Sequence, residues 1–521
     1  MDKKWWTLIA VCIGVFMLLI DVTVVNTALP AIQRSLHSSF TDLQWVVNAY
    51  ALTLAAFLLT AGSLGDLTGR RRVFSVGLIL FTAASLLCGL ASSPLMLNLA
   101  RAVQGVGGAV MFATSLALIA GAFHGRDRGT AFAAYGAVLG AAVAIGPLVG
   151  GGLTSGIGWR WIFFVNVPIG AIAVFLTLRH VSESRDPGAR TIDWVGLVTF
   201  SSALFLLIYA LSQGNGKGWG SGEIVGCLAG AAALLAAFGV AERRVRNPMF
   251  DLALLRRPAF AGAAIVGFAL SASIFALYLY LTLYIQNVLG YSPIQAGLRF
   301  LPMTVLLFLV SPISGRLTVR VPVRFILAAG LALIAVSLVL MSGLHANSTY
   351  SHLVLGFVIA GLGIGLVNPA LASTAVSVVP PEHAGMASGI NSTFRQAGIA
   401  TGIAGLGAIF QHEVSTKTLA SLHHSGNAAA ALSSTHGRLA STFASGSTGQ
   451  LARSLHPALR HAVTSAYDAA FTSALNEIIL IAAVVAAVGA IGGLLLVRTR
   501  DFVKPEQAPA GADVAAAAAA A

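Results

Sequence analysis

Charged residues are scarce in this chain of 521 residues. Asp, Glu, Lys and Arg make up 9% of it, against about 25% in soluble globular proteins. Hydrophobic residues make up 57%, and the mean hydropathy is +0.85. So few charges cannot cover the surface of a soluble protein of this size. The composition therefore excludes soluble enzymes and binding modules, and it predicts a protein that lies in lipid.

Cysteine is also scarce, and several functional motifs are missing. The three cysteines, Cys12, Cys88 and Cys227, each lie within an apolar run, so neither disulfides nor a zinc cluster are expected. No Walker sequence, nucleophile–base constellation or haem-type histidine pair occurs in the apolar runs. We therefore expect no metal, no cofactor, no direct ATP coupling and no enzymatic activity.

The net charge of +13 does not indicate nucleic-acid binding. The basic residues lie in short hydrophilic gaps between long apolar runs, whereas a nucleic-acid site needs them clustered on one soluble face. The first apolar run is too long for a signal peptide, and no small-residue cleavage site follows it. We expect this run to be retained as a membrane span.

Apolar segments of about 20 residues, the length that crosses a bilayer as a helix, recur along the chain. We count fourteen, and their even number places both termini on one side. They begin near Trp5, Leu43, Val73, Leu95, Thr130, Ile162, Trp194, Ile224, Ala259, Leu298, Phe325, Leu353, Met386 and Ser473.

The basic residues indicate the orientation of these spans. Of the 31 Lys and Arg residues, 21 fall in the gaps on the side of the termini. The positive-inside rule makes that side cytoplasmic. The sequence therefore predicts an all-α, multi-pass protein of the plasma (inner) membrane with both termini in the cytoplasm.

The chain contains a weak internal repeat. Residues 64–68 (LGDLT) resemble residues 314–318 (SGRLT), and Gly105 and Gly107 in the fourth span are echoed by Gly361 and Gly363 in the twelfth. Both offsets are about 250 residues, so spans one to six resemble spans nine to fourteen, with two spans inserted. Such repeats are typical of transporters that work by alternating access.

The repeat predicts four parts of the chain. Residues 1–178 form an N-terminal six-helix bundle, and 179–258 form a linker with two inserted membrane helices. Residues 259–500 form a C-terminal six-helix bundle with a long external loop at 412–470, and 501–521 form a disordered tail. The loop holds six of the twelve histidines, but their spacing matches no metal-ligand motif, so we interpret it as a solvated, partly helical segment.

Four motifs resemble those of a known family. Residues 62–72 (GSLGDLTGRRR) resemble the cytoplasmic loop signature of the major facilitator superfamily, with a departure at Leu67, where a basic residue is common. Residues 20–30 (IDVTVVNTALP), 159–170 (WRWIFFVNVPIG) and 394–398 (FRQAG) look like the fourteen-span drug:proton antiporter family. The resemblance implies the major facilitator fold, with two six-helix bundles and two inserted central helices. We expect a monomer.

The loop signature supplies the candidate cytoplasmic gate. Its glycines permit a tight turn, and its aspartate and arginines can form a charge latch. The resemblance implies that the aspartate meets a helix N-terminus in the other half and keeps the outward-facing state closed inside. Alternatively, the arginines only anchor the topology. The gate residues are Gly62, Gly65, Asp66, Gly69, Arg70 and Arg71.

A second motif, at the external end of the fifth span, contains Gly146, Pro147, Gly150 and Gly151. The proline bends the helix, and the glycines permit close helix approach. The resemblance implies that this motif is a hinge and a seal against proton leak in exporters. The alternative is packing alone.

Asp21, Arg101 and Gln104 are ionisable or polar residues within spans, and such residues are functional candidates. At 1.5 Å per residue they lie about 13, 9 and 13 Å from the outer ends of their spans, so they can meet. Burial disfavours a charged carboxylate and a nearby arginine favours it, which makes the pair a tunable proton site. The alternative is a static structural ion pair. The resemblance implies the coupling role.

Arg395 lies about 15 Å into the thirteenth span. It can pair with Asp21, cap carbonyl groups or meet substrate, and the sequence does not decide among these. Other polar residues that can line a largely apolar cavity are Asn26, Asn48, Tyr278, Tyr280, Tyr284, Asn368 and Asn391.

These features together predict proton-coupled export of amphiphilic small molecules such as drugs, antibiotics and dyes. The expected partners are this substrate, protons and the bilayer. The first alternative is an exporter of an endogenous lipid or a self-made antibiotic. An uptake symporter is a weaker alternative, because the Gly-Pro motif favours export. A sensor without transport activity is also weaker, because Asp21 and Arg101 are intact.

Overall fold

The computed structural model describes residues 2–123, 125–185, 192–245, 248–318, 320–345, 347–379, 384–424, 457–498 and 501–502. All regular structure in these ranges is helical. The elements are α1 (Lys3–Leu36), α2 (Phe40–Thr68), α3 (Arg70–Gly89), α4 (Pro94–Ala122), α5 (Gly125–Gly156), α6 (Trp161–Phe164), α7 (Asn166–His180), α8 (Trp194–Lys217), α9 (Gly222–Arg244), α10 (Leu252–Leu255), α11 (Pro258–Leu270), η1 (Ser271–Phe275), α12 (Ala276–Leu283), η2 (Tyr284–Val288), α13 (Pro293–Leu317), α14 (Val323–Met341), α15 (Ser351–Ser377), α16 (Ala384–His424) and α20 (Pro457–Leu496).

Thirteen of the described helical stretches are long and apolar enough to cross a membrane, counting α11 to η2 as one stretch and α6 with α7 as another. The fourteenth long helix is α16, which is more polar but packs inside the bundle against α2 and α20. The predicted all-α membrane fold is confirmed.

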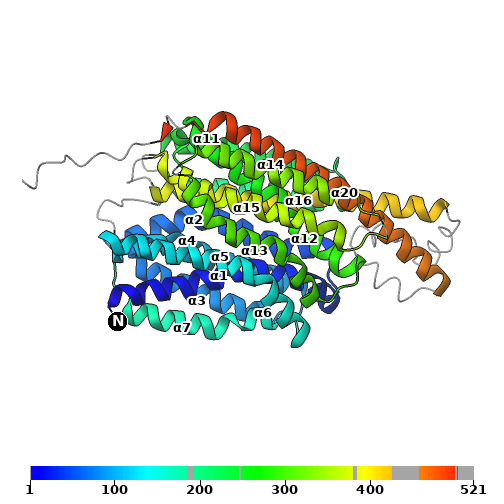
Figure 1. Ribbon diagram of the computed structural model, residues 1–521, viewed down its shortest axis with the longest axis horizontal. Coiled ribbons are helices and arrows are strands. Elements are labelled where there is room, and N and C mark those ends of the chain that lie inside the picture. The colour runs from blue at the N-terminus through cyan, green and yellow to red at the C-terminus, as the bar shows by residue number, and fades with distance from the viewer. Residues whose placement is uncertain are drawn as a thin grey trace, which may run out of the picture.

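The long helices run side by side along the longest axis of the molecule (Figure 1). The N-terminus lies at one end of the bundle, which we call the terminal end. At the opposite end α16 and α20 project beyond their neighbours (Figure 1). We call this the loop end.

Local sequence explains where several helices begin and end. Ser39 caps α2 in a capping box with Asp42, and Ser292 caps α13 in the same way with Gln295. Gly69 separates α2 from α3 with a φ of +123°, a conformation that side chains with a Cβ rarely adopt.

The internal repeat is visible in the packing of equivalent glycines. A Cβ added at Gly107 in α4 would lie 3.0 Å from the carbonyl oxygen of Gly77 in α3. A Cβ at Gly363 in α15 would lie 2.6 Å from the carbonyl oxygen of Gly330 in α14. Both glycines therefore let a helix pair approach backbone to backbone.

Helices α1 to α7 pack mainly on one another, as do α11 to α20, and α8 pairs with α9 beside α2 and α16. The two sets of helices meet chiefly where α5 crosses α13 and α2 crosses α16. The domain boundaries proposed above, with two six-helix bundles and an inserted pair, stay a prediction.

The apolar cores differ between the two ends. Towards the loop end, residues of α1 and α2 such as Val25 and Leu43 share one continuous core with residues of α12 and α20 such as Leu281 and Ile478. Towards the terminal end, α1, α3 and α4 form a separate core around Phe74 and Met111. The two sets of helices thus share a core near the loop end, and nearer the terminal end Leu59 of α2 shares a smaller core with Ala387 and Ile390 of α16.

Both helices that flank the predicted external loop at 412–470 extend into it, since α16 continues to His424 and α20 begins at Pro457. Lys417 pairs with Glu413 of its own helix at 2.8 Å and with Glu477 of α20 at 3.3 Å, which links the two helices. The loop boundaries stay a prediction. Hydropathy alone ends a span at the membrane edge, although the helix continues beyond it. Residues 425–456 of this loop and 503–521 of the predicted tail lie outside the described residues.

Candidate functional site

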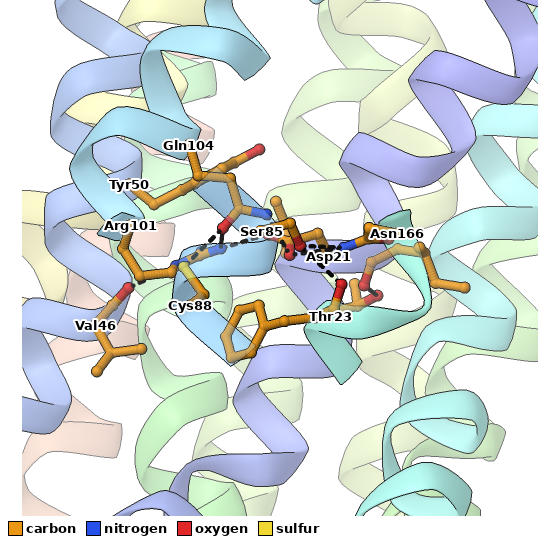
Figure 2. Close-up of polar contacts among 12 residues, drawn as sticks. Asp21, Thr23, Val46, Tyr50, Ser85, Cys88, Arg101, Gln104 and Asn166 are labelled. Carbon is orange, nitrogen blue, oxygen red and sulfur yellow. Dashed lines mark hydrogen bonds and ion pairs between the residues drawn. The ribbon is translucent and has the colours of Figure 1, made fainter. Parts of the chain in front are cut away.

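Asp21, Arg101 and Gln104 form a closed cluster between α1 and α4 (Figure 2). Arg101 Nη1 donates to Asp21 Oδ2 at 2.5 Å and to Gln104 Oε1 at 2.8 Å. Gln104 Nε2 donates to Asp21 Oδ1 at 2.9 Å. Each of these residues is at most 1% exposed. The structure therefore brings together the three residues that the sequence placed at matching depth.

Neighbouring helices supply a second set of contacts to this cluster. Asn166 Nδ2, at the start of α7, donates to Asp21 Oδ1 at 3.4 Å and to Ser85 Oγ in α3 at 3.0 Å. Arg101 Nε donates to the carbonyl oxygen of Val46 in α2 at 3.1 Å, and its guanidinium lies 4.2 Å from the ring centre of Tyr50. Five helices thus hold one ion pair (Figure 2).

The sequence interpretation missed Asn166, Ser85 and Tyr50 as members of this cluster. Asn166 did carry a signal, because it is a polar residue within a quoted motif in an apolar stretch. Both carboxylate oxygens of Asp21 accept hydrogen bonds. Each oxygen of this buried carboxylate therefore has a polar partner.

Asp66 lies at the terminal end and pairs with Arg70 at 2.8 Å, at the start of the next helix. It does not contact the other half of the chain among the described residues. Glu183, from the segment after α7, accepts from the Arg71 backbone N–H at 3.0 Å and approaches Arg72 at 3.6 Å. The expected contact of Asp66 with a helix N-terminus of the other half therefore stays a prediction.

Close contacts explain why two positions of this motif are glycine. A Cβ at Gly69 would lie 2.7 Å from the Glu183 carboxylate, and one at Gly65 would lie 2.7 Å from Thr114 in α4. Gly62 has only a distant neighbour, Ala113. Gly65 and Gly69 therefore set the approach of α2, α4 and the segment around Glu183.

We expect Asp66→Asn to lower export several-fold without removing the protein from the membrane. A charge at a helix end is worth about 0.3–1 kcal/mol when exposed, which is enough to shift a balance between two states. Efflux rate and membrane abundance measure the effect. The matched control is Arg72→Gln, whose partly exposed pair with Glu183 should matter little. Equal efflux from both variants and wild type would refute the latch.

The Gly-Pro motif of α5 lies at the crossing with α1 and α13. A Cβ at Gly146 would overlap Thr23 in α1, and one at Gly150 would lie 2.8 Å from the carbonyl oxygen of Val24. On the other face, a Cβ at Gly151 would lie 2.6 Å from the carbonyl oxygen of Pro293 at the start of α13.

Pro147 presents its carbonyl oxygen to Gly297 of α13 at a distance that leaves no room for a Cβ there. The motif is therefore part of the seam between the two sets of helices, near the loop end. The structure explains the motif by backbone-to-backbone packing of α5 against α1 and α13. A hinge or seal at this position stays a prediction.

Polar side chains also bridge the two sets of helices at the loop end. Gln44 Nε2 in α2 donates to Tyr280 Oη at 3.1 Å and to the carbonyl oxygen of Ile403 in α16 at 3.0 Å. Gln411 Nε2 donates to Gln44 Oε1 at 3.3 Å. This group, which we call the Gln44 clamp, was not found from the sequence, apart from Tyr280.

The other candidate cavity residues lie in several places. Asn26 donates back to the Val22 carbonyl oxygen of its own helix. Tyr278 stacks on Phe300 with ring centres 4.3 Å apart, and Tyr284 stacks on Phe471 at 6.4 Å. Buried polar atoms without a hydrogen-bond partner in the described chain occur on Asn48, Tyr278, Tyr284, Asn368 and Asn391.

Comparison with known proteins identifies the family. Residues 11–403 match the family model of the Major Facilitator Superfamily. The chain belongs to the major facilitator superfamily. Its fold agrees, since a bacterial homologue of the human lysosomal transporter Spinster superposes with a TM-score of 0.58 at 18% identity, over 97% of this chain and 99% of that chain.

Relatives within the superfamily are efflux and resistance proteins. Multidrug resistance protein Stp of Mycobacterium tuberculosis is 40% identical over 405 residues, covering 77% of this chain and 75% of Stp. The tetracenomycin C resistance and export protein of Streptomyces glaucescens is 36% identical over 413 residues, covering 79% and 77%. Puromycin resistance protein pur8 of Streptomyces alboniger is 36% identical over 413 residues, covering 78% and 82%.

This superfamily member is therefore an integral, multi-pass membrane transporter related to drug and antibiotic efflux pumps. The resemblance to the fourteen-span drug efflux group, inferred from three short motifs, is confirmed. So is the prediction that the chain is not an enzyme.

Proposed function

We propose that this transporter exports amphiphilic small molecules across the plasma membrane in exchange for protons. Both termini lie in the cytoplasm, so the terminal end faces inside and the loop end faces outside. Protons bind at Asp21, and substrate and protons favour different states of an alternating-access cycle.

The observation that supports proton exchange best is the closed cluster around Asp21. A carboxylate that is 1% exposed and paired with Arg101 at 2.5 Å is costly to keep charged without its partner. Any movement of α4 relative to α1 that separates the pair favours protonation of the carboxylate. Proton binding and helix movement are coupled in this way without any additional group.

The closed loop end supports the alternating-access part of the proposal. Besides the Gln44 clamp, Gln286 Nε2 in η2 donates to the Thr27 carbonyl oxygen in α1 at 2.7 Å, and the Ile294 backbone N–H donates to Ser155 Oγ at 3.0 Å. These contacts join opposite sets of helices near the loop end, and a transporter that works by alternating access must break such contacts when that end opens. Export then needs them to break together.

The energy source can be tested in vesicles. We expect purified protein in proteoliposomes to move a loaded dye when a pH gradient is imposed, and to stop when a protonophore collapses the gradient. A panel of anionic, neutral and cationic dyes makes the result independent of the charge preference of the transporter. Transport that ignores the gradient and requires ATP would exclude proton exchange.

A second candidate is export of an endogenous compound. Two relatives carry names that point this way, the tetracenomycin C resistance and export protein and a probable actinorhodin transporter of Streptomyces coelicolor. Comparing the culture media of a deletion strain and its parent tests it, since an endogenous substrate should accumulate inside the deletion strain and be missing from its medium.

A further inference from the structure

Arg395 is a cation inside the bundle that has no counter-ion among the described residues. It lies in α16, about 16 Å from the start of that helix at 1.5 Å per residue. Its Cγ lies 3.2 Å from the position that a Cβ would take at Gly267 in α11. No described ion pair or hydrogen bond includes Arg395, and the described carboxylates pair elsewhere or lie beyond ion-pair distance of it.

Two amide oxygens without a described hydrogen-bond partner occur on the helices around this site, one in α16 and one in α15. Asn391, one helical turn earlier on the same face of α16, is 8% exposed, and its Oδ1 has no hydrogen-bond partner in the described chain. This oxygen would lie 3.0 Å from a Cβ at Gly267. Leu371 of α15 also lies close to Gly267. Asn368, one helical turn before Leu371, has an Oδ1 without a hydrogen-bond partner in the described chain.

The contrast with Arg101 shows what is missing at Arg395. Arg101 satisfies its guanidinium with Asp21, Gln104 and a backbone carbonyl. A guanidinium held in a low-dielectric site without such partners is unfavourable. Intramembrane ionisable residues therefore usually serve a ligand pathway, and the guanidinium fork fits a carboxylate, sulfonate or phosphate with two parallel hydrogen bonds.

We propose that Arg395 and Asn391 bind an acidic group of the exported molecule, so that amphiphilic anions are preferred substrates. Arg395 supplies the charge and two donors, and Asn391 supplies the Nδ2 donor of its amide beside it. Gly267 keeps the space for both side chains open. This inference rests on the proposed export function and names the substrate class of that function.

The test is equilibrium binding of two dyes that share a xanthene ring system. Full-length protein in phosphatidylcholine nanodiscs is titrated with fluorescein, which carries a carboxylate, and with rhodamine 6G, a cation. We expect wild-type protein to bind fluorescein and Arg395→Gln to bind it about tenfold or more weakly, the size of one charge-assisted contact. Arg395→Lys should be intermediate, and rhodamine 6G binding should not weaken.

The controls separate ligand recognition from folding. Arg299→Gln removes the same charge from α13, where the guanidinium stacks 3.3 Å from the Tyr291 ring centre, and should leave fluorescein binding unchanged. Because Arg395 has no described partner to lose, Arg395→Gln should melt at the wild-type temperature or above it.

Several outcomes would overturn the proposal. The first is that wild-type protein does not bind fluorescein. The second is that Arg395→Gln binds fluorescein with unchanged affinity, and the third is that Arg395→Gln loses affinity for both dyes equally. If phosphatidylglycerol in the nanodiscs removes fluorescein binding from wild-type protein, a lipid headgroup and not the substrate occupies the site. Binding is measured without a gradient, so failure of proton coupling cannot produce any of these results.

Discussion

Asp21→Asn should abolish uphill export while leaving downhill substrate movement in place. Asparagine keeps the size and one acceptor oxygen for Arg101 Nη1, which lies 2.5 Å from the carboxylate, but it cannot exchange a proton. We expect accumulation against a gradient to fall to the level of empty vesicles. Efflux down a substrate gradient, measured in the same vesicles, should persist.

This variant also leaves Arg101 without its counter-ion, so its stability must be checked. Breaking a buried ion pair at one partner is destabilising, and a lower melting temperature is expected. The double variant Asp21→Asn/Arg101→Gln removes both charges and should recover part of that loss. If the double variant is stable but still fails at uphill export, the defect lies in proton exchange and not in folding.

Arg101 can be tested by the pH dependence of export. Removing its positive charge in Arg101→Ala favours the protonated form of the neighbouring carboxylate. Deprotonation then requires a higher pH, so the pH optimum of export should move upward. Arg101→Lys keeps the charge but not the fork that reaches both Asp21 and Gln104, and its optimum should be intermediate. An unchanged pH optimum in Arg101→Ala would show that Arg101 does not influence proton binding at Asp21.

Gly407→Ala should open the loop end. A Cβ at Gly407 in α16 would overlap Gln44 Nε2 and lie 2.6 Å from Tyr280 Oη, so the methyl group displaces the Gln44 clamp. Overpacking costs about 1–3 kcal/mol, which shifts a two-state balance roughly five- to hundredfold. We expect export to fall by a similar factor.

The opening can be measured as a distance between the two sets of helices. Spin labels at Ser35→Cys and Thr349→Cys, both exposed at the loop end, should move apart in Gly407→Ala. The matched control is Gly405→Ala in the same helix, because a Cβ there has nothing within 4 Å. The three native cysteines are replaced by serine in all samples. Identical label distances in both variants would mean that the Gln44 clamp does not hold the loop end closed.

Depth along a helix could be predicted from the sequence, and helix rotation could not. The rise of 1.5 Å per residue placed Asp21, Arg101 and Gln104 at one level, and the structure brings them together. Asn166 and Ser85 join the same cluster from helices whose rotation and neighbours are set by packing. Nothing in a single sequence specifies those contacts.

The polar clamp at the loop end was missed for a related reason. Gln44 lies near the start of a predicted span, where polar residues are normal at a membrane interface. Its partners come from residues 280, 403 and 411, so the contact exists only once α2 crosses α12 and α16. The motif at Asp66, in contrast, was found by resemblance, but its partner depends on which state of the cycle is described.

Proton release on substrate addition tests the proposed exchange most directly. Purified wild-type protein in weakly buffered solution, at a series of pH values, receives a dye that it exports, and a pH indicator records the protons set free. We predict release of about one proton per bound dye from wild-type protein, with Asp21 as the only exchanging group, and no release from Asp21→Asn that still binds the dye. Equal release from both proteins would contradict a proton site at Asp21.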